Sequence, residues 1–145
     1  DELVMVTFKL NVMKQSRTAA VKWLAEIAHS NPMWIGTSTA AKLGIKTGDI
    51  VEVSNERGKV VVPAYVTEGC MPDVVVLFEG AWMDLAKDGT DRSGNPDFLT
   101  LDEPSPAGAF AYNTILVDLK KTSLEHHPGW DMQATSRSVI FRRDK

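Results

Sequence analysis

The stretch AAKLGIKTGDIVEVSNERGKVVVPAYV, residues 40–66, decides the fold of this protein. It starts with the composition of a helix end, and Gly44 is the expected stop because glycine adopts the left-handed conformation without steric cost. Gly48 then permits a tight turn, and the apolar residues from Ile50 onward begin a strand. The stretch therefore predicts a helix end, a turn and a strand in immediate succession.

The second half of the stretch predicts a hairpin. The polar residues 55–58 reverse the chain, and Gly58 is expected at a positive φ, as tight turns often require. The segment KVVVPAYVTE at 59–68 follows as the partner strand. Pro63 cannot donate a backbone hydrogen bond, so it predicts a sheet edge or a bulge.

Four segments outside this stretch also have the composition of strands, being rich in β-branched and other apolar residues and bounded by turn-forming residues. They are LVMVTFKL at 3–10, MWI at 33–35, PDVVVLFEG at 72–80 and YNTILVDLKK at 112–121. Many short strands at close spacing, without a regular alternation of strands and helices, favour a closed β-barrel over a parallel, doubly wound sheet.

Two short helices are expected between the strands. Ser16 is placed to cap a helix over 17–30, which ends at Pro32 because proline disfavours helical geometry in the preceding residue. A second helix, capped by one of the hydroxyl side chains at 37–38, runs to Leu43. The face of the first helix that is expected to be buried consists of Ala20, Val21, Leu24, Ile27 and Ala28.

Length and composition limit the classes of protein to consider. The 145 residues fit one domain, and 43% hydrophobic with 24% charged residues is typical of globular proteins. A net charge of -3 argues against a nucleic-acid partner. No segment is apolar for long enough to predict a membrane span. The single cysteine, Cys70, excludes intrachain disulfides and thiolate metal clusters within these residues, and it fits a periplasmic or a cytoplasmic location equally.

No catalytic or metal-binding motif stands out. His29, His126 and His127 do not form a ligand quartet by their spacing, so we expect surface histidines and no metal site. There is no nucleophile elbow and no P-loop, and Cys70 has no base assigned to it. Hydrolase and nucleotide-triphosphatase functions therefore lack support.

A cluster of polar and basic residues follows the first predicted strand, where a helix is expected to begin. Free N–H groups and cations at such a point favour the binding of an anion. The alternative is a capped helix whose neighbouring basic side chains are exposed to solvent and bind no ligand. The cluster consists of Thr7, Lys9, Asn11, Lys14, Gln15, Ser16, Arg17 and Thr18.

Five motifs occur in chain order over roughly residues 3–121. They are TFKLNVMKQSRT at 7–18, NPMWI at 31–35, AKLGIKTGDIVEVSNERGKVVVPAYVTEG at 41–69, GNPDFLT at 94–100 and SPAGAFAYNTILVDLKK at 105–121. Together they resemble the C-terminal molybdopterin-dinucleotide-binding domain of the dimethyl sulfoxide reductase family of molybdenum and tungsten enzymes. Within that family the resemblance is to the polysulfide and thiosulfate reductase branch.

The resemblance implies a six-stranded double-psi β-barrel at 1–121 and a C-terminal extension, able to act as a docking tail, at 122–145. It also implies that the chain binds the organic part of a bis(molybdopterin guanine dinucleotide) cofactor, with metal ligation and redox chemistry elsewhere, so that the chain alone is not catalytic. The implied partners are the remaining domains or the catalytic subunit of a molybdoenzyme, with an iron–sulfur subunit as an optional further one. The alternative function is a stand-alone double-psi barrel that serves as a protein-interaction or substrate-recognition module.

The cofactor carries pyrophosphates, pterin rings and guanines, so its site needs cations, hydroxyls, amides and exposed backbone. Local alternatives remain open, because Asn31 also suits the end of the preceding helix and Asp97 also suits an Asx-type turn after Gly94. The expected cofactor-binding residues are Thr7, Lys9, Lys14, Gln15, Ser16, Arg17, Thr18, Asn31, Asn95, Asp97, Thr100 and Tyr112.

Overall fold

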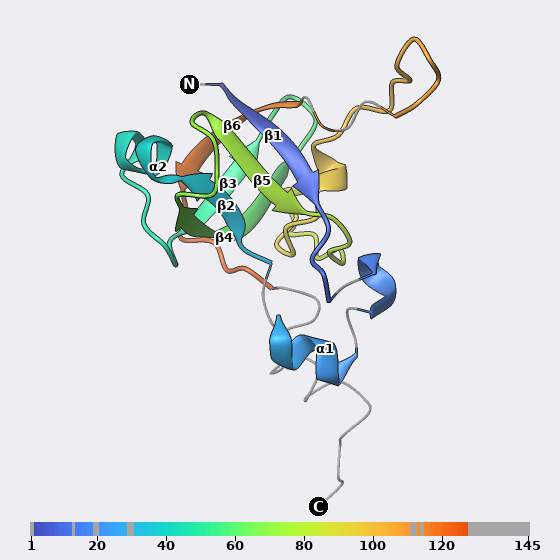
Figure 1. Ribbon diagram of the computed structural model, residues 1–145, viewed down its shortest axis with the longest axis horizontal. Helices are drawn as coiled ribbons and strands as arrows, with labels where there is room; N and C mark the ends of the chain where they lie inside the picture. Colours follow the sequence, from blue (N-terminus) through green and yellow to red (C-terminus); the bar gives the residue numbers. More distant parts are fainter. Residues whose placement is uncertain are drawn as a thin grey trace, which may run out of the picture.

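The computed structural model describes residues 2–12, 14–18, 21–28, 31–110, 113 and 115–127. Six strands close into a barrel in the order β1-β5-β2-β4-β3-β6 (Figure 1). The mainly β class and the closed barrel expected from the sequence are confirmed. The strands are β1 Leu3–Phe8, β2 Met33–Gly36, β3 Ile50–Ser54, β4 Lys59–Thr67, β5 Val74–Phe78 and β6 Ile115–Lys121.

The strand pairing has the double-psi connectivity. Strand β1 is parallel to β5, which is antiparallel to β2, so the consecutive strands β1 and β2 are antiparallel and flank β5. In the same way β4 is parallel to β2, so the consecutive strands β4 and β5 flank β2. Two interlocked crossovers of this kind, closed by the antiparallel pairs that β3 and β6 make, form a double-psi barrel.

The barrel interior is filled by alternate residues of each strand, as the period of two in a strand requires. In β4 the inward residues Val60, Val62 and Ala64 are buried in the main core cluster. Val61 is also fully buried although it lies on the outer face. Its backbone N–H donates to Asp91 O at 2.8 Å, which brings an irregular loop over this face of β4.

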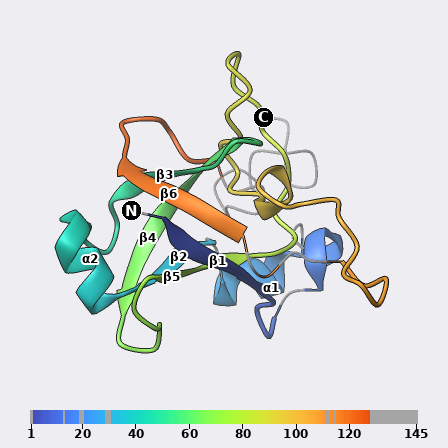
Figure 2. The same ribbon diagram turned by 90° about the horizontal axis from the view of Figure 1, so that it is seen from above.

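Helix α2, Thr37–Leu43, ends as expected at Gly44, which has a φ of 65°. Its N-cap is Gly36, one residue before the hydroxyl side chains expected to cap it. A Cβ atom on Gly36 would lie 2.8 Å from Cys70 O, so close packing explains the glycine there. In Figures 1 and 2 this helix lies on the opposite side of the barrel from the 3₁₀ helix η1, Gln15–Thr18.

Two details of the predicted hairpin were wrong. Gly58 does not have a positive φ; a Cβ atom there would lie 2.6 Å from Phe98 O, so space and not backbone conformation requires the glycine. Pro63 is not on an edge strand, because β4 pairs with both β3 and β2 in the closed barrel. It is not in a bulge either, because the register between β3 and β4 is unbroken up to Pro63. It lies between the bridge that Val60 makes to Asp91 and the β2 pairing that begins at Ala64, where no donor is required.

The single helix expected over 17–30 is also wrong. The 3₁₀ helix η1 ends at Thr18, and α1, Lys22–Ile27, begins after an extended Val21 that provides no side-chain cap. The expected buried face is exposed at Val21 (39%) and Ile27 (69%). Figure 1 shows α1 standing away from the barrel, so its apolar residues have no barrel core to enter.

The first part of the predicted C-terminal extension, residues 122–127, packs against the barrel, as the hydrogen bonds below show. The rest of it, including the strand-like SVIF, lies outside the described residues. Within the described ranges no helix is long and apolar enough to span a membrane.

Candidate functional site

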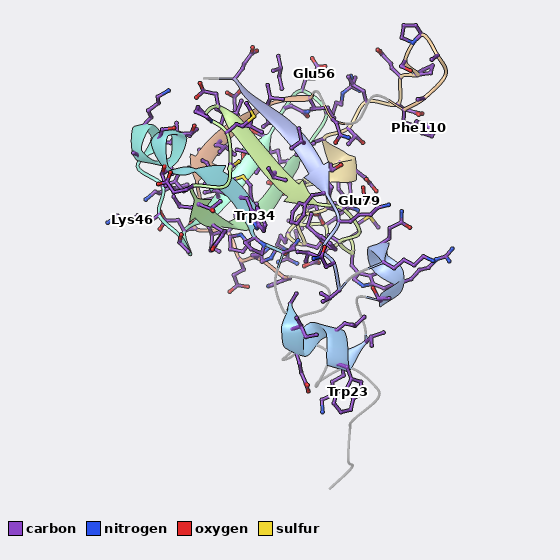
Figure 3. All side chains as sticks on the ribbon, viewed as in Figure 1. Trp23, Trp34, Lys46, Glu56, Glu79 and Phe110 are labelled. Carbon is purple, nitrogen blue, oxygen red and sulfur yellow. The ribbon has the colours of Figure 1, made fainter. Side chains whose placement is uncertain are left out.

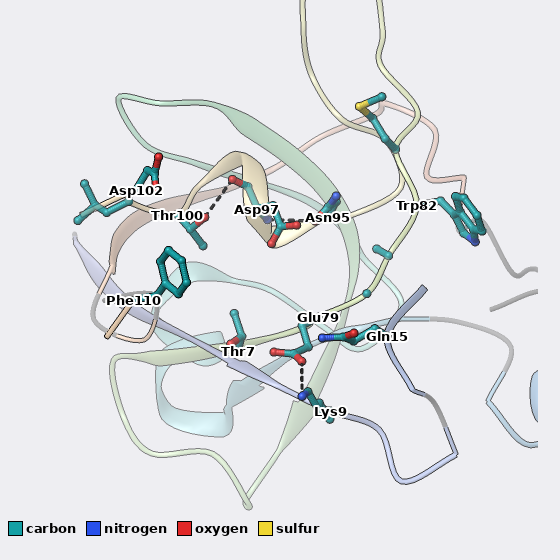
Figure 4. Close-up of a pocket in the computed structure, with 14 residues that line it drawn as sticks. Thr7, Lys9, Gln15, Glu79, Trp82, Asn95, Asp97, Thr100, Asp102 and Phe110 are labelled. Carbon is teal, nitrogen blue, oxygen red and sulfur yellow. Dashed lines mark hydrogen bonds and ion pairs between the residues drawn. The ribbon is translucent and has the colours of Figure 1, made fainter. Parts of the chain in front are cut away.

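A polar pocket of about 800 Å³ lies where β1 and β5 end (Figure 4). Six of the twelve expected cofactor-binding residues line it: Thr7, Lys9, Gln15, Asn95, Asp97 and Thr100. Barrel closure brings these residues together from segments that are far apart in the sequence. The lining is completed by Glu79, Gly80, Ala81, Trp82, Met83, Leu101, Asp102 and Phe110.

The parallel pairing of β1 with β5 builds one wall of the pocket. Phe8 is opposite Phe78 in this pairing, so the residues that follow both strands emerge at the same edge. The backbone N–H of Glu79 donates to Phe8 O at 3.0 Å, and Lys9 Nζ lies 3.0 Å from Glu79 Oε1. Lys9 therefore offsets the negative charge of a carboxylate that sequence reasoning did not place in the site.

The second wall is the Asx-type turn that the sequence left as an alternative. Asn95 Oδ1 accepts a hydrogen bond from Asp97 N at 3.0 Å, and Thr100 Oγ1 donates to Asp97 O at 3.1 Å. This turn forms the 3₁₀ helix η2, Pro96–Phe98. The pKa of Asp97 is raised, first by burial and then by the nearby Glu79 carboxylate. A turn that is structural in origin thus also presents its side chains to the pocket.

Only part of the basic cluster reaches the pocket: Thr7, Lys9 and Gln15 line it, whereas Lys14, Arg17 and Thr18 are not among its lining residues. Gln15, which lines it, has a left-handed φ of 52°, a conformation that costs a residue with a side chain about 1 kcal/mol or more. Lys14 and Arg17 are exposed on the same turn, and no ion pair within the described residues engages them. Thr18 Oγ1 accepts a hydrogen bond from Lys14 N at 2.7 Å, which stabilises the turn. The Ser16 side chain lies outside the described part of the structure.

Asp91 is the residue that holds the pocket loop together, and the sequence reading missed it. Its fully buried carboxylate accepts hydrogen bonds from Asp84 N at 2.9 Å, Asn95 N at 2.7 Å and Ser93 Oγ at 2.9 Å. The Ser93 hydroxyl also contacts Trp82 O. The only signal in the sequence was the density of Asp, Ser, Gly and Asn in this loop, which indicates turns but not the partner of each side chain.

Asn31 does not line the pocket, although it lies directly behind the pocket wall. It is buried, and its Nδ2 donates to Ser93 O at 2.7 Å. A Cβ atom on Gly94 would lie 2.9 Å from that Nδ2 atom and 2.2 Å from Val62 Cγ1. Asn31 and Gly94 are therefore packed too closely for a ligand to lie between them.

The other end of the Asn31 amide meets His126, which the sequence reading expected at the surface. His126 Nε2 lies 2.8 Å from Asn31 Oδ1, and its Nδ1 lies 2.8 Å from Val61 O. Burial lowers the pKa of His126, so the neutral ring is favoured. His126 is thus a half-buried structural residue, and its expected surface position was wrong.

His127 binds the same loop from outside. Its N–H donates to Arg92 O at 2.7 Å, and its Nδ1 lies 2.7 Å from Asp84 Oδ2. The pKa of Asp84 is held below its ordinary value first by the hydrogen bond from His127 and then by that from Arg92. In the part of the chain that the structure describes, no three metal-ligating side chains are grouped closely enough to hold an ion.

The last wall of the pocket includes the approach to β6. Asn113 Oδ1 accepts hydrogen bonds from both Thr7 N and Thr7 Oγ1, each at 3.0 Å. Tyr112 lies outside the described residues. Three exposed apolar side chains stand at the rim, Trp82 (48%), Met83 (64%) and Phe110 (71%), and the sequence reading had not assigned them to the site.

Comparisons with known proteins agree with this geometry. The family model described as "Molydopterin dinucleotide binding domain" matches residues 3–115. Among solved structures, the acetylene hydratase from Pelobacter acetylenicus has a similar fold, with a TM-score of 0.70 over 83% of this chain and 18% of that chain at 15% identity.

Relatives with sequence similarity are reductases. "Dimethyl sulfoxide reductase DmsA" of Escherichia coli K12 is 43% identical over 90 residues, which is 61% of this chain and 11% of that protein. "Dimethyl sulfoxide/trimethylamine N-oxide reductase" of Cereibacter sphaeroides is 32% identical over 119 residues, 78% of this chain and 14% of that protein. The chain therefore spans a small part of their length. These relatives do not distinguish the polysulfide and thiosulfate branch expected from the sequence.

Proposed function

The chain belongs to this molybdopterin dinucleotide-binding domain family, and from that premise we propose that the pocket at the ends of β1 and β5 contacts the organic part of molybdopterin guanine dinucleotide. We propose further that this happens inside a larger oxidoreductase. The observation that carries the proposal is that Lys9, Gln15, Asn95 and Asp97, from remote segments, line one pocket.

The size of the pocket and its donor set fit such a ligand. A cavity of about 800 Å³ lies in the upper part of the range of roughly 300–1,000 Å³ that is usual for cofactor sites. Figure 4 shows Asn95, Asp97 and Asp102 on one side of the pocket and Lys9 with Gln15 on the other. The site therefore offers hydrogen-bond acceptors on one side and, on the other, the Gln15 amide and a cation that is paired with Glu79. A ligand with N–H-rich rings and phosphates requires acceptors and donors of these kinds.

Each wall has its own proposed role. The carboxylate of Asp97 accepts hydrogen bonds from the N–H groups of a pterin or guanine edge, which also relieves the unfavourable burial of its charge. The exposed cations Lys14 and Arg17, together with the turn that contains Ser16 and Thr18, face pyrophosphate at the mouth. Asn31 acts from behind the wall, and Tyr112 remains a proposed contact. The bound cofactor supplies the metal-centred redox chemistry, to which this chain contributes binding and orientation.

The remaining proposals concern the rest of the enzyme. The relatives are several times longer than this chain, so other domains or a catalytic subunit are the proposed partners, with an iron–sulfur subunit as a further one. The exposed rim residues Trp82, Met83 and Phe110 suit a pocket that such a partner covers. We also propose that the barrel domain comprises residues 1–121 and that residues 122–145 form a C-terminal extension.

The test is to release nucleotide by acid from the purified native protein, with the whole polypeptide or complex that carries this chain kept together. We expect guanosine monophosphate and a fluorescent pterin in stoichiometric amounts. The double variant Lys14→Ala and Arg17→Ala should retain several-fold less nucleotide after desalting in high salt, since phosphate contacts are weakened by screening.

The matched control for this test is Lys46→Ala, an exposed cation that Figure 3 shows on the far side of the barrel from Glu79. Its nucleotide content should equal that of the wild type. Wild-type protein that releases neither guanosine monophosphate nor pterin would contradict the proposal. That result would favour the alternative, a double-psi barrel that serves as an interaction or recognition module.

A further inference from the structure

We propose that residues 122–127 form a clasp in which His126 and His127 are positioning residues for the pocket loop 91–97. The inference rests on the proposed function for its ligand. The inference goes beyond the proposed function because it assigns a role to a segment that follows the last strand and lies outside the matched residues 3–115. Two histidine contacts, each to a different part of the loop, carry the argument.

The first contact works through Asn31. The His126 ring lies between Val61 O and Asn31 Oδ1, at 2.8 Å from each. Asn31 in turn donates to Ser93 O at 2.7 Å, directly before the buried Gly94. His126 therefore sets the orientation of the amide that supports the pocket wall from behind.

The second contact works through Asp84. His127 binds Asp84 Oδ2 at 2.7 Å with its ring and Arg92 O at 2.7 Å with its backbone N–H. Arg92 also bonds to Asp84, through Nη2 to Oδ1 at 3.1 Å and through N to O at 2.8 Å. The clasp thus ties Asp84 to Arg92, at the start of the pocket loop 91–97.

Both contacts lead to Asp91, a buried residue of the pocket loop that does not itself line the pocket. Asp91 lies between them, and its carboxylate accepts from Asp84 N and Asn95 N. Asn95 then accepts from Asp97 N, and both side chains line the pocket. A displacement of the clasp is therefore transmitted to Asn95 and Asp97 through a continuous set of hydrogen bonds.

The loop needs such support because it has little regular structure. Between β5, which ends at Phe78, and η2, which begins at Pro96, the described chain forms isolated bridges at Leu85 and Asp91 but no strand or helix. A loop of this kind opens locally at a lower free energy than the barrel strands. Contacts with the clasp raise that free energy, and so hold the pocket wall in the geometry that binds a ligand.

The test compares three variants in the purified native protein, kept whole. His126→Ala removes the ring. His126→Gln replaces the ring by an amide whose N–H groups can still donate to one of the two facing oxygens, as the single N–H of the neutral imidazole does. Ser123→Ala, at an exposed position in the same clasp, is the matched control.

The first readout is hydrogen exchange at the backbone amides of Asn95 and Asp97, compared with those of Val53 and Val75 in the barrel core. For His126→Ala we expect exchange of the two loop amides to rise about tenfold, with the core amides unchanged. His126→Gln should restore part of the protection, and Ser123→Ala should match the wild type. The second readout is bound guanosine monophosphate, which should fall in the same order.

The outcomes separate this inference from the proposed function. Wild-type protein without guanosine monophosphate contradicts the proposed function, while the exchange data still test the clasp. If nucleotide is present but His126→Ala leaves the exchange of Asn95 unchanged, the clasp is overturned. It is also overturned if exchange rises equally at Val53 and Val75, because that result shows general destabilisation without positioning.

Discussion

The ammonium group of Lys9 lies 3.0 Å from the carboxylate of Glu79, across the edge at which two parallel strands end. The Glu79 side chain is 23% exposed and that of Lys9 is 60% exposed, so the pair stands at the border between the pocket and solvent. Burial raises the pKa of Asp97, and the nearby Glu79 carboxylate raises it further. Lys9 therefore offsets the charge of Glu79, which would otherwise repel an anionic ligand.

Replacement of Lys9 should thus harm cofactor retention more than replacement of its partner. We expect Lys9→Met to retain several-fold less guanosine monophosphate, because the Glu79 carboxylate is then left without its cation. Glu79→Gln should retain as much as the wild type, and the pKa of Asp97, followed by NMR, should fall toward 3.8 as the repulsion disappears. Equal losses of nucleotide in the two variants would show that the ion pair itself, and not the cation, is what the site needs.

Asp91→Asn should be strongly destabilising. The substitution replaces one buried carboxylate oxygen by an amide that donates, so the N–H of Asp84 or of Asn95 loses its acceptor. An unpaired buried donor costs about 1–3 kcal/mol, and we expect a loss in the free energy of unfolding of about 2–3 kcal/mol in urea titrations. Asp88→Asn, an exposed residue that accepts from Thr90 N at 3.1 Å, is the control and should cost less than about 1 kcal/mol. Similar losses in both variants would refute the central role of Asp91.

Gly94→Ala and Gly89→Ala separate backbone strain from steric clash. Both glycines have a positive φ, of 77° and 83°, so both alanines are strained by about 1 kcal/mol. Only at Gly94 would the new Cβ clash, at 2.2 Å from Val62 Cγ1; at Gly89 nothing lies within 4 Å. We expect thermal or urea unfolding to show a loss at Gly94 that is larger by about 1–3 kcal/mol. Equal losses would mean that the wall behind the pocket is loosely packed.

His126 should make the stability of the protein depend on pH near neutrality. Its pKa in the folded state is lowered from 6.5 by burial, so as the pH falls through about 6.5 the unfolded chain takes up a proton before the folded chain does. The contribution of the neutral ring to the free energy of unfolding is present in full above that pH and is lost progressively as the pH falls below it. Urea midpoints measured between about pH 8 and about pH 5 should therefore fall more steeply for the wild type than for His126→Gln. Parallel profiles would show that the ring titrates normally.

The local part of this fold could be read from the residues. Helix α2 ends at Gly44 because only a residue without a side chain adopts a φ of 65° readily, and that requirement is visible in the sequence. The strands follow from runs of β-branched residues at a period of two. The polar types at 7–18 and 94–100 also pointed to the pocket, which six of the residues expected from them do line.

The errors have a common physical origin in contacts between remote residues. Gly58 was assigned a positive φ, but its role comes from Phe98, which η2 brings within 2.6 Å of a Cβ at that position. The face of α1 was expected to be buried because its spacing is helical, yet periodicity shows only which residues share a face and not whether a core lies opposite.

The sequence by itself determined the strands, the turns and the family of this protein, because backbone conformation depends on the residues in and next to each element. Only the tertiary structure decided that Asn31 supports the pocket wall from behind, that Asp91 binds its loop and that His126 is partly buried. The bonds of Asn31 to Ser93 and to His126 span 62 and 95 residues. Such contacts exist only after the barrel closes, since closure alone brings these segments within hydrogen-bonding distance.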